Sequence, residues 1–321
     1  MNSTEIDSFT PGDQRIVAYV LMVSGFLGVM MNMFVVYNLA KRPVFHCAFG
    51  RICMSHSMAA LGNNATFAFM IAPITFIDPQ YHLSSWGQRS GVLIVLFWTV
   101  GILSHLLMAV NRFVCMYFPL KYTFIFTDIF TLKTIALAWI IGFVLAFLQF
   151  IPGCQCYIGI EYFDFQFLPN QCGLILGLYM DFMLSIAAIT AVALLDCLTY
   201  LRIKKYQEKL EQANQHVASK SNVKFFYQSA AQGIAAAIEV CIYFWVSPYV
   251  IYKWTHFACS SLIFLGVNLI DAIIISLFNK EMRHQLIRAS TINAMGIRNL
   301  IGTVEAIKRH PRSGSPGLEI A

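Results

Sequence analysis

Long apolar stretches separated by short polar segments make up most of the chain. A helix needs about 20 mainly apolar residues to cross a bilayer, and seven stretches reach that length. They lie near residues 16–39, 48–77, 90–117, 132–151, 173–200, 225–251 and 256–278. Several exceed the minimum, so we expect tilted helices or helices that extend beyond the hydrocarbon. The pattern predicts an all-α membrane protein built as a seven-transmembrane helix bundle.

Composition agrees with this pattern. Hydrophobic residues make up 58% of the chain and charged residues only 12%, whereas a soluble domain is about one-quarter charged. The mean hydropathy is +0.65. These values exclude an ordinary soluble domain and leave a polytopic membrane protein.

Lysines and arginines are distributed unevenly between the predicted loops. Seven spans place the two chain ends on opposite sides of the membrane, and the side richer in basic residues is the cytoplasmic one. With the N-terminus outside, the outer side holds only Arg15, Arg89 and Lys253, and the inner side holds the other 19 of 22. We therefore predict an outside N-terminus. The net charge of +6 then reflects orientation and attraction to anionic membrane lipid, and we expect no nucleic-acid partner.

The spans divide the chain into four parts. We expect an extracellular tail over 1–15, the bundle over 16–278, an amphipathic interfacial helix over 279–292 and a disordered cytoplasmic tail over 293–321. The first residues lack the pattern of a cleavable signal, so the first span is expected to direct insertion. A sequon predicts glycosylation at Asn2.

Three of the nine cysteines, Cys154, Cys156 and Cys172, lie in the loop between the fourth and fifth spans. The predicted topology puts this loop in an oxidising space, where disulfides form. A bridge from Cys172 to either Cys154 or Cys156 would tie the loop into a lid. Three thiols cannot all pair with one another, so the sequence leaves the choice open.

Several apolar spans carry polar side chains that must avoid lipid. Gly28 and Asn32 share a face of the first helix because they are four residues apart. The further members of this expected intramembrane network are Asn63, Asn64, Asn268 and Asp271. A carboxylate in lipid is unfavourable, so Asp271 should point inward. Such a network either clamps the helices together or takes part in a conformational switch, and we weigh the two equally.

A ligand pocket is expected in the outer half of the bundle, where aromatic and apolar side chains mix with a few polar ones. The candidates are Ile94, Val95, Trp98, Thr99, Tyr179, Asp181, Tyr249, Tyr252 and Lys253. For each of them, packing or an interfacial aromatic belt is the more common role. The outer half of the third span has no acid, which argues against a monoamine held by a carboxylate on that helix.

The remaining titratable residues in the spans fall into two groups: the acids are functional candidates by default, whereas the histidines favour structural roles. Asp196 lies near the inner end of the fifth span, where Arg202 or Lys224 could pair with it, and Glu239 faces the bundle or a neighbouring subunit. His56 and His105 share no metal-binding spacing with a second ligand, so we expect hydrogen-bonded histidines. No catalytic or phosphate-binding motif occurs, and we predict neither an enzyme nor a bound metal or cofactor.

The third span ends in the most informative motif of the chain. Its members are Asn111, Arg112, Phe113, Pro119, Leu120 and Tyr122. A lone arginine before a helix-ending proline fits a stop-transfer charge at a cytoplasmic edge. The segment also resembles the Asp-Arg-Tyr and Pro-Leu-x-Tyr signature of rhodopsin-like G-protein-coupled receptors. Arg112, Pro119, Leu120 and Tyr122 match it, whereas Asn111 and Phe113 replace the acid and the tyrosine.

Other segments extend the resemblance, including Gly28-x-x-x-Asn32, Trp139 in the fourth span and Asn279-Lys280-Glu281-Met282-Arg283 after the seventh. Asp271-Ala272-Ile273-Ile274-Ile275 stands where the family has Asn/Asp-Pro-x-x-Tyr. The chain departs from the family in the sixth span, where Trp245 precedes Pro248 by three residues instead of two.

A further departure is Gly87, which occupies the position of the usual loop-tethering cysteine. With the cysteines confined to one loop, Phe49-Gly50 opening the second span and Asn111-Arg112-Phe113 closing the third, the chain resembles nematode chemosensory receptors of serpentine receptor class x. The resemblance covers about residues 20–290.

The resemblance implies a chemosensory receptor in the plasma membrane, in sensory cilia in particular, that detects an outer small-molecule ligand and activates a heterotrimeric G protein. Arg112 would be the inner part of the switch, and Pro248 would kink the sixth helix. Asn111 removes the acid that normally restrains the arginine, so we expect a resting state held by other contacts and some activity without ligand. The basic segment 201–224 would extend the fifth helix toward the G protein or lie on the membrane.

Two alternatives to this reading stay open. One is a receptor of the same architecture for an endogenous peptide or transmitter. The other is a seven-helix channel or transporter subunit. Assembly of several receptor copies is also left open by the sequence.

Overall fold

A computed structural model describes residues 9–212, 220–280 and 282–285. The chain divides at Phe278 into two units, and Met1–Phe278 contains the helical bundle. In the second unit, the amide of Arg283 donates to the carbonyl of Asn279 at 2.9 Å, which forms one helical turn. The expected interfacial helix lies only partly within the described residues. Asn2 and the tail 293–321 lie outside them.

Seven helical segments of the described chain are long and apolar enough to cross a membrane, as the sequence predicts. They are Pro11–Lys41, Ala48–Ile77, Arg89–Tyr117, Asp128–Leu148, Gln171–Glu208, Phe226–Tyr249 and Lys253–Phe278.

The first four segments are formed by α1 (Pro11–Lys41), α2 (Ala48–Thr66) with η2 (Phe67–Ile71) and α3 (Ala72–Ile77), α4 (Arg89–Tyr117) and α6 (Asp128–Leu148). The short helices η1 (Pro43–Phe45), η3 (Pro79–Leu83) and α5 (Pro119–Ile125) lie in the connections.

The fifth segment is formed by α7 (Gln171–Ile175), η4 (Leu176–Met183) and α8 (Leu184–Gln212). The sixth is formed by α9 (Lys220–Cys241), η5 (Ile242–Val246) and η6 (Ser247–Tyr249). The seventh is formed by α10 (Lys253–Phe257), η7 (Ala258–Leu262) and α11 (Ile263–Phe278). The helices η2, η4, η5 and η7 are wider π-type turns, which are frequent at functional sites.

The first helix begins earlier than the apolar pattern indicates. Thr10 and Asp13 form a capping box: the Thr10 hydroxyl accepts from the Asp13 amide at 3.2 Å, and Asp13 accepts from the Thr10 amide at 3.0 Å. Pro11 occupies the first turn, where its missing amide hydrogen removes no helical bond. The helix therefore begins at Pro11, before the predicted span near residue 16, because polar capping residues open it.

The sixth span also differs from its prediction. Pro248 lies in η6, at the very end of the span, so it ends the helix and does not kink its middle. The irregular turn is η5, which includes Trp245, and that side chain is 49% exposed.

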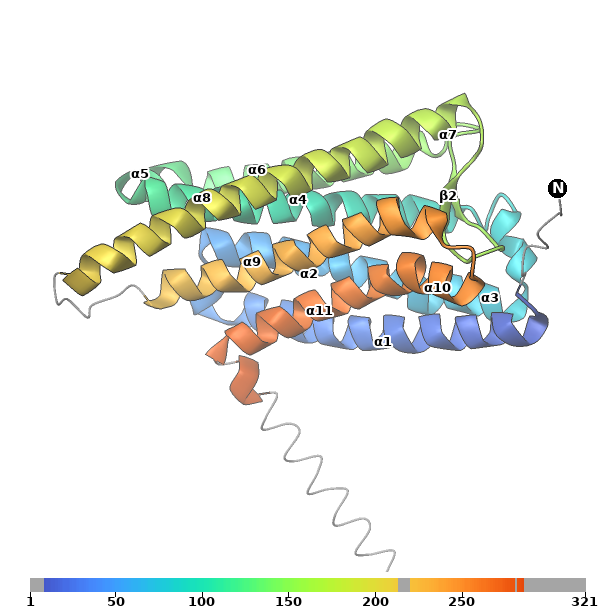
Figure 1. Ribbon diagram of the computed structural model, residues 1–321, viewed down its shortest axis with the longest axis horizontal. Coiled ribbons are helices and arrows are strands. Elements are labelled where there is room, and N and C mark those ends of the chain that lie inside the picture. Colours follow the sequence, from blue (N-terminus) through green and yellow to red (C-terminus); the bar gives the residue numbers. More distant parts are fainter. Residues whose placement is uncertain (1–8, 213–219, 281, 286–321) are drawn as a thin grey trace, which may run out of the picture. The chain divides into compact units, whose positions relative to one another are not determined.

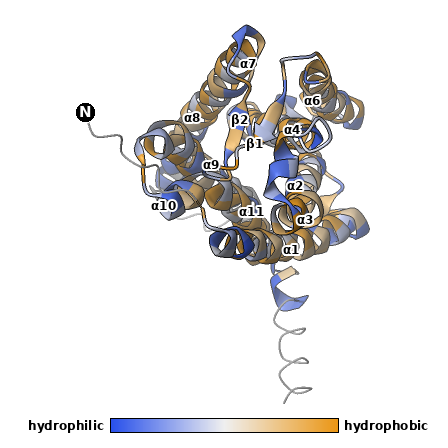
Figure 2. Ribbon diagram, turned by 90° about the vertical axis from the view of Figure 1, so that its right-hand side faces the viewer, coloured by the Kyte–Doolittle hydropathy of each residue, from blue (hydrophilic) through white to orange (hydrophobic). Residues whose placement is uncertain are grey.

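The described chain also contains a two-stranded antiparallel sheet, which the all-α prediction lacks. The strands β1 (Cys156–Ile158) and β2 (Phe165–Phe167) pair with Cys156 opposite Phe167 and Ile158 opposite Phe165. Figure 1 shows this hairpin at the end of the bundle where α7 and α10 begin. We call this end the hairpin end, and the opposite end of α4 the Arg112 end. Figure 2 looks onto the hairpin end and shows both strands inside the ring of helices.

The bundle has an apolar outer surface and a partly polar interior. Large apolar side chains such as Met30, Phe143 and Leu194 are exposed, as expected for helices that face lipid. Four of the five predicted network residues are buried, namely Asn32, Asn63, Asn64 and Asp271, and Asn268 is partly buried. The expectation that these polar groups point inward is confirmed.

Candidate functional site

A cavity lies beneath the hairpin, between helices that are far apart in the sequence. Its lining consists of Ile94, Val95, Trp98, Cys156, Phe165, Phe167, Asp181, Glu239, Val240, Tyr243, Phe244 and Phe264. Four predicted pocket residues, Ile94, Val95, Trp98 and Asp181, are among them. Thr99 borders a second, adjoining cavity that Trp98 and Asp181 also line.

Four predicted pocket residues lie elsewhere. Tyr179, Tyr249 and Tyr252 are 55%, 81% and 59% exposed and face outward. The Lys253 ammonium lies 3.1 Å from the Asp13 carboxylate, so it ties the start of α10 to the start of α1. For Tyr252 and Lys253 the reason is that η6 ends the sixth helix before these residues are reached.

Two interactions shape the interior of this cavity. The Trp98 indole donates to the Ser185 hydroxyl at 3.2 Å, which joins α4 to α8. The Tyr243 hydroxyl donates to the carbonyl of Phe165 at 3.2 Å, which joins η5 to β2. The hairpin therefore forms part of the cavity wall. Sequence reasoning missed Phe165 and Phe167 because it placed no structure in that loop.

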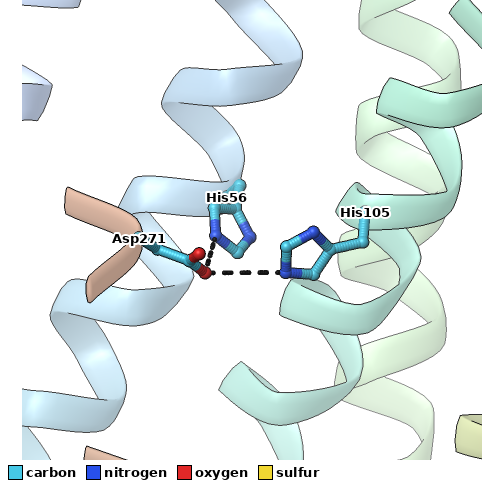
Figure 3. A group of neighbouring side chains, drawn as sticks. All are labelled: His56, His105 and Asp271. Carbon is cyan, nitrogen blue, oxygen red and sulfur yellow. Dashed lines mark hydrogen bonds and ion pairs between the residues drawn. The ribbon is translucent and has the colours of Figure 1, made fainter. Parts of the chain in front are cut away.

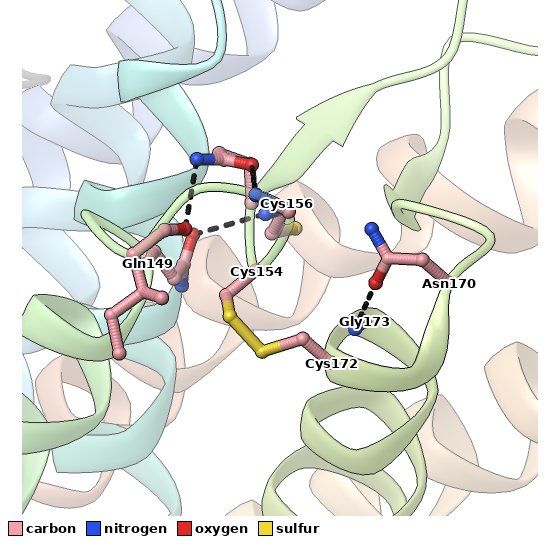
Figure 4. The surroundings of a disulfide bond; sticks show 9 residues. Gln149, Cys154, Cys156, Asn170, Cys172 and Gly173 are labelled. Carbon is pink, nitrogen blue, oxygen red and sulfur yellow. Dashed lines mark hydrogen bonds between the residues drawn. A yellow bond between two sulfur atoms is a disulfide. The ribbon is translucent and has the colours of Figure 1, made fainter.

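A disulfide fixes the base of the hairpin (Figure 4). Cys154 pairs with Cys172, with a Cα–Cα distance of 5.0 Å. Of the two partners that the sequence left open for Cys172, the structure therefore shows Cys154. Cys156 stays a free, buried thiol, and burial raises its pKa well above the ordinary value. Its amide donates to the Gln149 side chain at 3.2 Å. A protonated, enclosed thiol is unreactive, so Cys156 acts as a packing residue.

The α4 helix approaches the hairpin closely at Gly91. A Cβ atom at this position would lie 2.0 Å from the carbonyl oxygen of Cys156. No other residue type fits without movement of the strand, so this glycine sets the depth of the hairpin in the bundle.

The tip of the hairpin is held by α10 and η7. His256 Nε2 lies 3.2 Å from the Asp164 carboxylate, and the Tyr162 ring stacks on His256 with 4.2 Å between centroids. The Ser261 hydroxyl donates to the carbonyl of Phe163. Phe163 has a φ of 53° and is fully buried, a backbone conformation that its packing must maintain.

At the Arg112 end, the arginine forms a buried ion pair. Arg112 Nη2 lies 2.6 Å from Asp196 Oδ1, and the two side chains are 6% and 14% exposed. The expected pairing of Asp196 with Arg202 is wrong: the Arg202 guanidinium lies over the Tyr117 ring at 5.6 Å. The side chain of Lys224 lies outside the described residues. Asp196 on α8 thus supplies the carboxylate that Asn111 lacks.

The rest of the predicted motif surrounds this ion pair. The Asn111 side chain donates to the Tyr122 hydroxyl at 3.1 Å, and burial raises the pKa of this phenol, which stays protonated. Phe113 stacks on Tyr117 at 4.5 Å, and Pro119 opens α5. A groove at this end is lined by Cys47, Phe49, Asn111, Arg112, Cys115, Met116, Pro119, Tyr122 and Phe226. Leu120 is 89% exposed and does not contribute to it.

Between the two ends, the predicted polar network separates into two parts. The Asn32 side chain donates to the Asn268 carbonyl at 3.1 Å, which links α1 to α11. Asn64 donates within its own helix, to the carbonyl of Ala60 at 2.8 Å. The preceding residue, Asn63, is also buried, but its Oδ1 has no hydrogen-bond partner among the described residues.

Asp271 contacts histidines and not these amides (Figure 3). One carboxylate oxygen lies 2.9 Å from His56 Nε2 and 3.6 Å from His105 Nε2. The sequence prediction treated each histidine as isolated, because spacing along one chain segment cannot reveal a cluster formed by three helices. These three residues are the described side chains best placed to hold a metal ion.

Comparison with known proteins agrees with this architecture. Squid rhodopsin matches with a TM-score of 0.65 at 10% sequence identity, over 87% of this chain and 86% of that one. This similarity shows a rhodopsin-like fold. Two curated proteins of Caenorhabditis elegans are also similar in sequence.

Serpentine receptor class X 45 is 25% identical over 292 residues, which cover 85% of this chain and 81% of the relative. Serpentine receptor class X-43 is 23% identical over 288 residues, which cover 86% and 88%. The family model described as "Serpentine type 7TM GPCR chemoreceptor Srx" matches residues 22–279. The chain is thus a multi-pass membrane protein that belongs to the Srx family of serpentine seven-transmembrane G-protein-coupled chemoreceptors.

Proposed function

We propose that the chain binds a small molecule in the cavity beneath the hairpin and activates a heterotrimeric G protein at the Arg112 end. The observation that carries the proposal is the course of α4. The same helix lines the cavity through Ile94 and Trp98 and carries Arg112 at its other end. A ligand that prefers one position of this helix therefore also favours one packing around the arginine.

The cavity lining supports a ligand with an aromatic or apolar body and a basic group. Six of its side chains are aromatic, and Asp181 and Glu239 are its two acids. Glu239 is 3% exposed, and its Oε1 has no hydrogen-bond partner among the described residues. An ammonium group would satisfy this oxygen and bind the faces of the rings. Such an amine is held from α9 and η4, not from α4.

The distribution of charge supports an orientation in the membrane, and membership of a chemoreceptor family supports the cellular setting. The excess of basic residues on the loops of the Arg112 end supports a cytoplasmic location for that end. The disulfide at the hairpin end is consistent with an oxidising exterior. We place the receptor in the plasma membrane of a sensory cell, including its cilia. An epitope tag added at Asn2 should be labelled on intact cells, and labelling only after permeabilisation would reverse the orientation.

The cavity also bears on the other candidate functions. Hairpin residues line the cavity and a disulfide fixes the base of the hairpin, which favours a small molecule over a folded peptide. A channel or transporter subunit needs no ion pair between Arg112 and Asp196. Current or uptake in the absence of any G protein would support that alternative and contradict the proposal.

The ligand class is tested in cells that express the receptor with a G-protein reporter. Aromatic amines are compared with isosteric uncharged analogues, and active amines are tested again on Glu239→Gln. We expect at least about a tenfold loss of potency for the amine because its charge partner is removed. Glu161→Gln changes an exposed acid of the hairpin loop and is the matched control. Equal losses in both variants, or a panel in which only uncharged compounds act, would contradict an amine ligand.

The coupling role of Arg112 needs a separate test. Arg112→Ala should abolish ligand-dependent signalling while surface expression persists. Arg51→Ala is the control because Arg51 also forms an ion pair, with Asp128 at 3.1 Å, outside the groove. Unchanged signalling by Arg112→Ala would exclude this arginine as the switch.

A further inference from the structure

Three buried side chains from three different helices converge in the middle of the bundle. His56 comes from α2, His105 from α4 and Asp271 from α11, and they are 3%, 6% and 2% exposed. Figure 3 shows both imidazoles pointing at the same carboxylate. The ring centroids of the two histidines are 4.3 Å apart. One potential ligand atom from each residue lies within 4.8 Å of the other two.

These distances match the requirements of a transition-metal site. Zinc binds imidazole nitrogen and carboxylate oxygen at about 2.0–2.2 Å, so two ligand atoms in a tetrahedral arrangement lie about 3.4 Å apart. Asp271 Oδ2 lies 2.9 Å from one histidine nitrogen and 3.6 Å from the other, values on either side of that separation. Small side-chain movements would place all three ligands around one ion.

We propose that His56, His105 and Asp271 form a binding site for a divalent transition-metal ion such as Zn²⁺. Two imidazole ligands select such ions, whereas Mg²⁺ and Ca²⁺ require oxygen ligands. Asp271 supplies a negative charge, which favours a cation in a buried site. A fourth coordination position is open to a water molecule or to ligand groups.

Unsatisfied atoms within the cluster support this assignment. Asp271 Oδ1 and His56 Nδ1 have no hydrogen-bond partner among the described residues. A buried carboxylate normally has both oxygens satisfied, because an unpaired buried acceptor is unfavourable. An ion that both carboxylate oxygens contact would give Oδ1 the partner that the described side chains do not supply.

A bound ion would act on the positions of three helices at once. It joins α2, α4 and α11 and favours the packing in which their ligand atoms are close. Arg112 lies about two helical turns from His105 on α4, in the direction of the groove. A bound metal ion would therefore stabilise the conformation of α4 in which Arg112 is paired with Asp196.

The test uses the full-length receptor, purified in detergent and freed of metal. Its thermal unfolding is measured with Zn²⁺ and, separately, with Mg²⁺. We expect Zn²⁺ to raise the melting temperature by several degrees and Mg²⁺ to have no effect, since only bound ligand stabilises the folded state. His105→Gln and Asp271→Asn should weaken the apparent Zn²⁺ affinity by about 100-fold or more. His46→Gln alters an exposed histidine outside the bundle core and should leave it unchanged.

A second measurement needs no variant and so does not depend on how well the variants fold. Co²⁺ replaces Zn²⁺ in the unmutated receptor, and its absorption spectrum reports the ligand type. Nitrogen and oxygen ligands give visible d–d bands, whereas exposed cysteines would add an intense sulfur charge-transfer band. Visible d–d bands without the sulfur band, at a stoichiometry of one Co²⁺ per receptor, support the site. A sulfur spectrum, no bound ion, or equal Zn²⁺ stabilisation of His105→Gln and wild type would overturn it. None of these readouts depends on the ligand or on the G protein.

Discussion

The two ends of the bundle are closed by different means. At the hairpin end, a disulfide, a positive-φ residue packed among aromatic rings and an ion pair between Asp164 and His256 fix one loop over the cavity. At the Arg112 end, one buried ion pair joins α4 to α8 beside a groove. Several independent contacts resist change together, whereas a single ion pair can be exchanged for another partner. The hairpin end is thus built to keep its shape, and the Arg112 end is built to change.

The largest effect is expected from breaking the buried ion pair of the Arg112 end. Asp196→Asn leaves a buried arginine without its charge partner, which is destabilising by about 3 kcal/mol or more. If the pair holds the resting state, signalling without ligand should also rise. Thermal unfolding and ligand-free reporter activity measure the two effects.

The matched control for that variant is Asp128→Asn, which removes a 73% exposed partner of Arg51. An exposed ion pair contributes at most about 1 kcal/mol, so stability should hardly change. If Asp196→Asn behaved like this control, the Arg112 end would be held by other contacts.

Opening the disulfide should have the next largest effect. The bridge spans 18 residues, and the entropy of a loop of this size corresponds to about 3 kcal/mol. Cys154→Ser and Cys172→Ser should lower the melting temperature and ligand potency equally, since each removes the same bond. Cys172 is the common partner in both pairings that the sequence leaves open, and the observed bridge makes Cys154 its partner. Cys156→Ala should change stability by only about 1 kcal/mol, and a larger loss than in the other two would contradict the pairing.

Acid should loosen the hairpin end through His82 of η3. Burial lowers the pKa of this imidazole to about 4, and its Nε2 bonds the Thr75 hydroxyl at 2.9 Å. The unfolded state takes up a proton near pH 6.5 and the folded state only near pH 4, so stability is complete above pH 6.5 and falls between these values. The loss should be on the order of 2 to 3 kcal/mol.

Unfolding midpoints at several pH values measure this effect. The change of the midpoint with pH should be smaller in His82→Asn than in the unmutated receptor. An unchanged dependence on pH in the variant would assign the acid sensitivity to other groups.

The smallest effect is expected at the tip of the hairpin. Asp164→Asn keeps the size of the side chain but removes its charge, so the contact with His256 should weaken by about 1 kcal/mol. Hydrogen exchange of the amides in 156–167 should become faster while the melting temperature hardly changes. Glu161→Gln, an exposed acid three residues away, is the control. Exchange that is equally fast in both variants would show that the disulfide and the aromatic contacts hold the hairpin without this pair.

Local patterns in the sequence predicted the parts of the molecule that depend on one segment at a time. The seven spans follow from apolar length, and the motif from Asn111 to Tyr122 follows from residue order. The inward position of Asp271 follows from the cost of a charge in lipid. These features require no knowledge of which helices are neighbours.

The remaining features depend on contacts between distant segments. Arg112 and Asp196 are 84 residues apart, and His56 and Asp271 are 215 apart. No spacing rule identifies such partners. The hairpin was missed for a different reason: each strand has three residues, too few for an alternating pattern to stand out from a loop.

The contact between Gly91 and the carbonyl of Cys156 has a consequence for the evolution of such receptors. A single added methyl group at this position would push the strand outward and enlarge the space beneath it. The range of ligand sizes can therefore change through a residue outside the cavity lining, while every side chain that contacts the ligand stays the same. Diversification of a receptor does not require its recognition residues to vary.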